Sequence, residues 1–259
     1  PWTGTWSLHT LIDTSTQSVT NAEDFLLADL DKDGNQEIIW ASASTGTDQG
    51  KITAFRNGSS NVWSTWSDKV DIATNPTAEI SKYPIMGYFD NDNYLDLAVF
   101  DDEDQILLIP GSETIDTIVG SNIDIVWDGS SGTDLTTIAL SDIDSDQRLD
   151  IFFASSGTDK DVRAILNDFS YISGNPNWNA YDRCSSDTTV NGIVSDDLNM
   201  DGIQDIVFWA GSELHVFEGN NKPSQSVSSS MIEDLGSTIQ HIILEDIDID
   251  GDQDIVVTT

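Results

Sequence analysis

Residues 29–37 read DLDKDGNQE and lie between the apolar runs FLLA (25–28) and IIWAS (38–42). Four segments of the same kind follow: YFDNDNYLD (88–96), DIDSDQRLD (142–150), DLNMDGIQD (197–205) and DIDIDGDQD (246–254). We call the five segments loops 1 to 5 and number the positions within each from 1 to 9. Because the loops begin at 29, 88, 142, 197 and 246, they are 59, 54, 55 and 49 residues apart, and the chain is built from internal repeats.

Each loop is flanked by apolar runs of four or five residues, which are too short and too rich in Ile and Val for helices and indicate two strands. A third run follows at KITAFRN (51–57), QILLIPG (105–111), VRAILND (162–168) and ELHVFEG (213–219). Weaker fourth segments carry a tryptophan: TWSLHTLI (5–12), TWSDKVDI (65–72), IDIVWDGS (123–130) and NPNWNAYD (175–182). Four short strands per unit predict an all-β fold, a single β-propeller domain over residues 1–259 with four-stranded antiparallel blades.

Two arrangements of these five repeats stay open. The chain starts at Pro1 rather than Met and stops after the second strand of the fifth unit, so we expect a processed or excised piece of a longer product. In a closed five-bladed ring, the segment TGTWSLHTLI (3–12) would complete the last blade. The alternative is a fragment of a seven- or eight-bladed propeller.

The acidic side chains of loop 1 stand at positions 1, 3, 5 and 9, and Gly34 at position 6 permits a sharp turn that brings the position 7 carbonyl inward. Oxygen donors without His or Cys favour calcium over zinc or copper, and a flexible cage of six or seven oxygens favours calcium over magnesium. An EF-hand would need a Glu at position 12, where the five repeats have Trp40, Val99, Phe153, Phe208 and Val257. The pattern therefore predicts a calcium loop inside a β-hairpin.

The pattern D-x-D-x-D-G-x-x-D between two apolar strands resembles the FG-GAP and VCBS repeats of integrin α-subunits and many bacterial surface proteins. The resemblance covers nearly the whole chain and implies a calcium ion in the loop between the first two strands of each blade, four to five ions in all. The ligands that it implies at positions 1, 3, 5 and 9 are Asp29, Asp31, Asp33 and Glu37; Asp90, Asp92 and Asp96; Asp142, Asp144, Asp146 and Asp150; Asp197, Asn199, Asp201 and Asp205; and Asp246, Asp248, Asp250 and Asp254. The position 7 carbonyls of Asn35, Tyr94, Arg148, Ile203 and Asp252 complete the sets.

Loop 2 departs most from the pattern, because Tyr88 stands at position 1 and Asn93 at position 6. We expect its site to be the weakest or empty. Loop 3 has Gln147 in place of the position 6 glycine, although its carboxylates are intact.

Acidic loops could also be plain solvated surface, since the chain has a formal net charge of −36. Five loops in register with strand ends favour metal sites, because carboxylates packed together repel one another unless a cation neutralises them. The same charge makes nucleic acid a poor partner, and the lack of an apolar run of about 18 residues argues against membrane insertion.

No catalytic constellation stands out. The three histidines, His9, His215 and His241, occupy different places in the repeat, Cys184 has no His partner in the sequence pattern, and no G-x-S-x-G motif occurs. We therefore expect no enzyme, although paired carboxylates of a polysaccharide-degrading enzyme stay open. Recurring tryptophans (Trp6, Trp66, Trp127, Trp178, Trp40 and Trp209) could stack on sugars or pack between blades.

The sequence thus predicts a calcium-binding, secreted propeller at the cell surface, acting in recognition, adhesion or surface assembly. Its expected partner is a protein or glycan on a cell or matrix surface. A lectin-like propeller, a polysaccharide-degrading enzyme and a self-assembling subunit of a surface filament or layer are the alternatives.

Overall fold

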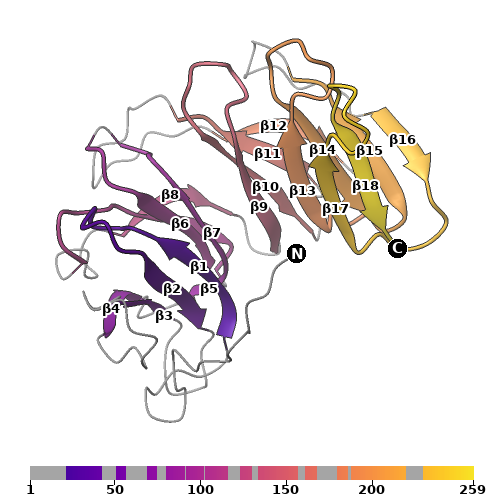
Figure 1. Cartoon of the computed structure of the whole chain (residues 1–259). Coiled ribbons are helices and arrows are strands. Elements are labelled where there is room, and N and C mark those ends of the chain that lie inside the picture. The colour runs from indigo at the N-terminus through magenta and orange to yellow at the C-terminus, as the bar shows by residue number, and fades with distance from the viewer. Residues whose placement is uncertain are drawn as a thin grey trace, which may run out of the picture.

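A computed structural model describes residues 22–42, 51–56, 69–74, 80–90, 92–101, 103–115, 123–129, 134–156, 161–167, 180–185, 188–219 and 230–259. These residues form five antiparallel sheets, and no α-helix occurs among them. Figure 1 shows the sheets following one another along an arc, with the first and the last at opposite ends. A closed ring is therefore not seen in the described part of the chain, and the segment 3–12 that could complete one lies outside it.

Each of the first four sheets contains four strands in chain order, as the repeat predicts. Sheet 1 consists of β1 (Ala22–Ala28), β2 (Glu37–Ser42), β3 (Lys51–Phe55) and β4 (Lys69–Thr74), and sheet 2 of β5 (Ile80–Gly87), β6 (Asp96–Asp101), β7 (Gln105–Ile109) and β8 (Asp124–Asp128). Sheet 3 consists of β9 (Leu135–Ser141), β10 (Asp150–Ser155), β11 (Asp161–Ile165) and β12 (Ala180–Ser185), and sheet 4 of β13 (Gly192–Asp196), β14 (Asp205–Ala210), β15 (Glu213–Phe217) and β16 (Ser230–Asp234). Sheet 5 has only β17 (His241–Glu245) and β18 (Asp254–Thr258) among the described residues.

The strands on either side of all five loops are confirmed, as are the four predicted third strands. The fourth strands β4, β8 and β12 overlap the tryptophan segments 65–72, 123–130 and 175–182, whereas 5–12 lies outside the described residues. Strand β16 was missed, because its sequence SMIED has no tryptophan and is not apolar.

The core is a series of apolar layers between neighbouring sheets. The second strand of each inner sheet contributes side chains to two of these layers, one on each face of its sheet. In β10, Ile151 and Phe153 pack against sheet 2, while Phe152 and Ala154 pack against sheet 4. Because successive side chains of a strand point to opposite faces, a strand that packs on both faces needs apolar residues at consecutive positions. This explains the uninterrupted apolar runs LAVF, IFFA and IVFWA.

The first strands of consecutive sheets lie side by side, from β1 beside β5 to β13 beside β17. One hydrogen bond of this contact runs from Ser195 Oγ in β13 to the carbonyl of Leu140 in β9. Since all five first strands enter their loops at the same end, loops 1 to 5 occupy one edge of the arc.

Candidate metal centres

The loops owe their shape to side-chain oxygens that accept hydrogen bonds from the loop backbone. In loop 4, Asp197 Oδ2 accepts from Gly202 N at 2.8 Å, Asn199 Oδ1 from Asp201 N at 2.9 Å, and Asp201 Oδ1 from Ile203 N at 2.9 Å. The side chains at positions 1, 3 and 5 thus accept from the backbone N–H groups of positions 6, 5 and 7, respectively. Loops 1 and 3 repeat all three bonds, and loop 5 repeats the first and the last.

The turn needs a left-handed backbone at two positions. Position 4 has a φ of 57° to 63° at Lys32, Ser145, Met200 and Ile249, and position 6 has a positive φ in all five loops, at Gly34, Asn93, Gln147, Gly202 and Gly251. Glycine and Asn adopt this conformation most readily, which accounts for the position 6 preference. Ile249 is the strained exception, since a β-branched residue rarely adopts a positive φ.

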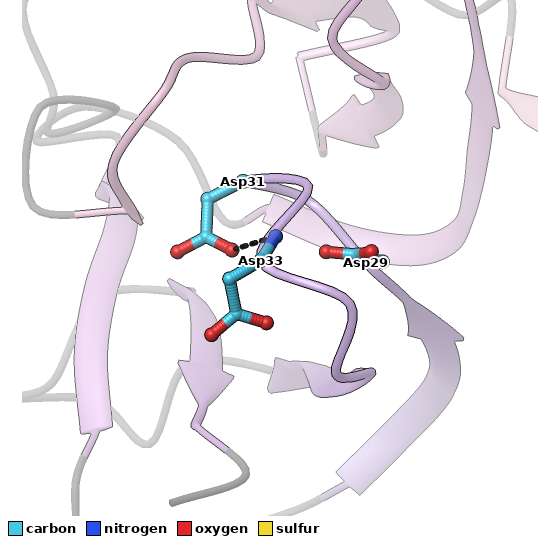
Figure 2. Close-up of side chains that lie close together, drawn as sticks. All are labelled: Asp29, Asp31 and Asp33. Atoms are coloured by element: carbon cyan, nitrogen blue, oxygen red, sulfur yellow. Dashed lines mark hydrogen bonds between the residues drawn. The ribbon is translucent and has the colours of Figure 1, made fainter. Parts of the chain in front are cut away.

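The conformation of the loops brings carboxylate oxygens close together. In loops 1, 3 and 5, one oxygen from each of positions 1, 3 and 5 lies within 4.8 Å of the others: Asp29, Asp31 and Asp33; Asp142, Asp144 and Asp146; and Asp246, Asp248 and Asp250. Figure 2 shows the set in loop 1, where Asp33 N donates to Asp31 at 3.3 Å. Loop 4 carries Asn199 at position 3, so it brings two carboxylates and an amide oxygen to the same positions.

Two observations in loop 1 fit a hard cation. Asp29 Oδ1 is buried and has no hydrogen-bond partner in the described structure, so a good acceptor stays unsatisfied. Burial, and after it the charges of Asp33 and Asp29, raise the pKa of Asp31 above its ordinary value. The same causes, burial first and repulsion from a neighbouring Asp second, raise the pKa of Asp144 in loop 3. A bound cation would relieve both the repulsion and the unsatisfied oxygen.

The carboxylates at position 9 have a second task that sequence reasoning missed. Asp205 is 1% exposed and accepts from Leu198 N at 3.1 Å and from Gly219 N, just after β15, at 2.8 Å. It therefore ties the start of the loop to the end of the third strand. Asp96 and Asp150 make the same link, since each accepts from the position 2 N–H of its own loop and from an N–H just after the third strand of its sheet. Glu37 and Asp254 accept the bond from position 2.

Burial of these position 9 carboxylates raises the pKa of Glu37, Asp96 and Asp150 to about 7. Within the described part of the chain, Asp96 is the one position 9 residue that also belongs to a set of carboxylates within 4.8 Å, with Asp90 and Asp92. An oxygen that accepts one hydrogen bond keeps a second lone pair, so ligation by position 9 is compatible with its bonds and stays a prediction.

Loop 2 differs as its sequence indicates. Tyr88 at position 1 is 48% exposed, and Asp96 takes the third place in the carboxylate set. The Lys32 ammonium of loop 1 lies 5.6 Å from the ring centre of Tyr88 and 5.5 Å from that of Tyr94, so a cation–π contact joins loops 1 and 2.

In loops 1, 2, 4 and 5, the residue at position 7 donates its backbone N–H to the position 5 carboxylate. These residues are Asn35, Tyr94, Ile203 and Asp252. Arg148 in loop 3 does the same. These bonds fix each residue in its loop. Ligation through their carbonyls stays a prediction.

The other candidates for chemistry do not come together in the described structure. His215 stacks on Phe208 with ring centres 4.7 Å apart and lies 3.3 Å from Glu213, while His241 is exposed at the start of β17 and His9 lies outside the described residues. Cys184 pairs with Val162 in the β11–β12 ladder.

The described tryptophans pack against other apolar residues. Trp127 of sheet 2 lies 4.7 Å from Phe153 of sheet 3, Trp40 contacts Phe55, and Trp209 is buried between sheets 4 and 5. The packing role of these three tryptophans is therefore seen, and sugar stacking stays a prediction. Trp6, Trp66 and Trp178 lie outside the described residues.

Comparisons with curated proteins and with solved structures give two findings. No curated protein sequence matches the chain. Among solved structures, it is similar to the one entitled "Crystal structure of BBS1N in complex with ARL6DN, soaked with lead", with 12% identity, a TM-score of 0.36 and coverage of 96% of this chain and 92% of that one. So distant a likeness carries no argument about this chain.

The described residues include no helix with the length and hydropathy that a membrane span requires.

The family comparison bears directly on the repeats. The model of the FG-GAP-like repeat matches residues 197–257, which contain loops 4 and 5 and strands β14 to β17. The resemblance drawn from the acidic loops is thereby confirmed for residues 197–257, which are similar to an FG-GAP-like repeat.

Proposed function

We propose that this chain is a calcium-binding module whose acidic loops are completed by the metal. The observation that carries the proposal is the convergence of three carboxylates in loops 1, 3 and 5, with the buried, unsatisfied Asp29 Oδ1 among them. Carboxylates in such a set repel one another, and a divalent cation removes that cost while satisfying the oxygens.

Within each loop, the residues at positions 1, 3 and 5 would hold the ion, with position 9 and the position 7 carbonyl as further donors. Bound calcium would supply positive charge and oxygen coordination, which lock the hairpin between the first and second strands. In loop 2 the set is Asp90, Asp92 and Asp96, and the missing carboxylate at position 1 should make it the weakest.

The proposed biological role is recognition or adhesion at a cell surface, or assembly of a surface structure. In support, loops 1 to 5 share one edge of the arc, so metal binding would shape one continuous surface for a protein or glycan partner. Extracellular calcium is abundant enough to fill the weak sites typical of extracellular modules, which favours a secreted location. We propose no enzymatic activity.

Calorimetry and thermal unfolding of the chelator-treated chain test the calcium function. Calcium should bind to several sites and raise the melting temperature, since each independent site filled at a hundredfold excess over its Kd contributes about 2.7 kcal/mol. Magnesium at the same concentration should do much less, because it demands near-octahedral geometry and gives up water reluctantly. A melting temperature that is the same in chelator and in calcium would contradict the proposal.

The surface role needs a separate measurement. Binding of the full chain to arrays of glycans and matrix proteins, with calcium and with chelator, should show a partner only in calcium. Binding that is equal in both conditions would mean that the loops do not shape the surface. Growth of assemblies in calcium without any array partner would favour the surface-layer alternative.

A further inference from the structure

One of the few basic side chains of this acidic protein lies inside an acidic loop. Arg148 stands at position 7 of loop 3, and its guanidinium forms an ion pair with Asp146 of the same loop. Its Nε also donates a hydrogen bond to the backbone carbonyl of Asn167, just beyond β11. The Arg148 backbone N–H donates to Asp146 Oδ1 at 2.9 Å, so Arg148 occupies both oxygens of this carboxylate.

The corresponding carboxylates of three other loops are engaged on one oxygen only. Asp33, Asp201 and Asp250 each accept the position 7 N–H through Oδ1, and no described residue donates to their Oδ2. The position 7 side chains of these loops are Asn, Ile and Asp, none of which carries positive charge. Loop 3 alone among these four has a cationic side chain on its position 5 carboxylate.

The Arg148 side chain is held by a residue that is itself fixed. Asn167 N donates to Asp150 Oδ1 at 2.8 Å, and Asn167 Nδ2 donates to the carbonyl of Tyr88 in loop 2 at 3.1 Å. Asn167 is 1% exposed. An arginine anchored to such a carbonyl loses less freedom on pairing with Asp146 than an ordinary surface arginine does.

We propose that Arg148 is the counter-charge of loop 3: its guanidinium neutralises Asp146 and holds it in place in the metal-free chain. Arg148 then competes with a divalent cation for the Asp146 carboxylate. The competition rests on the proposed calcium function, whereas the counter-charge role does not. Loop 3 should then keep its fold better than loops 1 and 5 when metal is withdrawn, and should bind calcium more weakly than its intact set of carboxylates indicates. Substitution of the Arg148 side chain keeps the backbone carbonyl at position 7, which is a predicted calcium ligand.

The test compares Arg148→Gln with Lys51→Gln in the full chain. Lys51 is a matched control, since it also forms an ion pair, with Asp71 at 3.3 Å, but in β3 rather than in a loop. In calorimetry with calcium, Arg148→Gln should strengthen one site roughly tenfold, which corresponds to about 1.4 kcal/mol, while Lys51→Gln leaves all sites within about twofold. In chelator, Arg148→Gln should lower the melting temperature more than Lys51→Gln does.

Each result has a defined meaning. An unchanged or weaker calcium isotherm in Arg148→Gln, with calcium binding intact in the unaltered chain, overturns the competition and leaves the calcium function standing. If neither chain binds calcium, the competition falls together with the calcium function. Equal melting temperatures of the two variants in chelator overturn the counter-charge role itself.

Discussion

Replacing Asp205 by Asn tests the double role of the position 9 carboxylate most directly. Asp205 is buried, and its two oxygens accept separate backbone N–H groups, Leu198 N at 3.1 Å and Gly219 N at 2.8 Å. Asparagine keeps one oxygen, so one of these N–H groups loses its acceptor and faces an NH₂ group instead. Loss of a hydrogen bond to a charged acceptor costs about 1.5–3 kcal/mol, and relief of carboxylate burial offsets part of this.

We therefore expect Asp205→Asn to lower the free energy of unfolding by about 2 kcal/mol, or the melting temperature by roughly 4–8 °C, even in chelator. The control is Asp201→Asn in the same loop. Among the described residues, Asp201 accepts a hydrogen bond from Ile203 N alone, a bond that asparagine can keep, and its side chain is exposed. In chelator, this control should change stability by less than about 0.5 kcal/mol.

Urea unfolding followed by tryptophan fluorescence, in chelator and in calcium, measures both variants. Asp201→Asn should lose part of the stabilisation by calcium, whereas Asp205→Asn should be destabilised in both conditions. If Asp205→Asn is as stable as the unaltered chain in chelator, the carboxylate does not tie the loop to the third strand, and the reasoning fails.

Two further predictions concern pH and backbone strain. Because burial raises the pKa of Asp96 and Asp150 to about 7, the folded metal-free chain binds protons more tightly than the unfolded chain, so its melting temperature in chelator should fall as pH rises from about 4 to 7. The fall should persist in high salt, which screens exposed charges; a rise over this range would show that these carboxylates are not destabilised by burial. Ile249 is 87% exposed and has a φ of 63°, so Ile249→Asn should stabilise the metal-free chain by about 1 kcal/mol in urea unfolding. Ile247→Asn, at a 60% exposed position without positive φ, is the control, and an equal effect of both changes would rule out relief of strain.

Local sequence signals predicted the parts of the fold that depend on neighbouring residues. The short apolar runs beside each loop form the predicted strands, and the alternation of carboxylates in loop 1 brings Asp29, Asp31 and Asp33 together, because each donor and acceptor lies within a few residues of the next. The departure of loop 2 at Tyr88 was equally visible, since it depends on one position of one repeat.

The sequence by itself determined the repeat, the strands and the acidic turns, all of which follow from local spacing. Only the tertiary structure decided that Asp205 bonds to Gly219, that Trp127 packs on Phe153 of the next sheet and that Arg148 is anchored by Asn167. These partners lie 14 to 26 residues apart, and they meet only after strands have paired in register and sheets have stacked. The physical reason is that burial and hydrogen bonding at these positions depend on packing between strands and sheets, which no pattern within one repeat specifies.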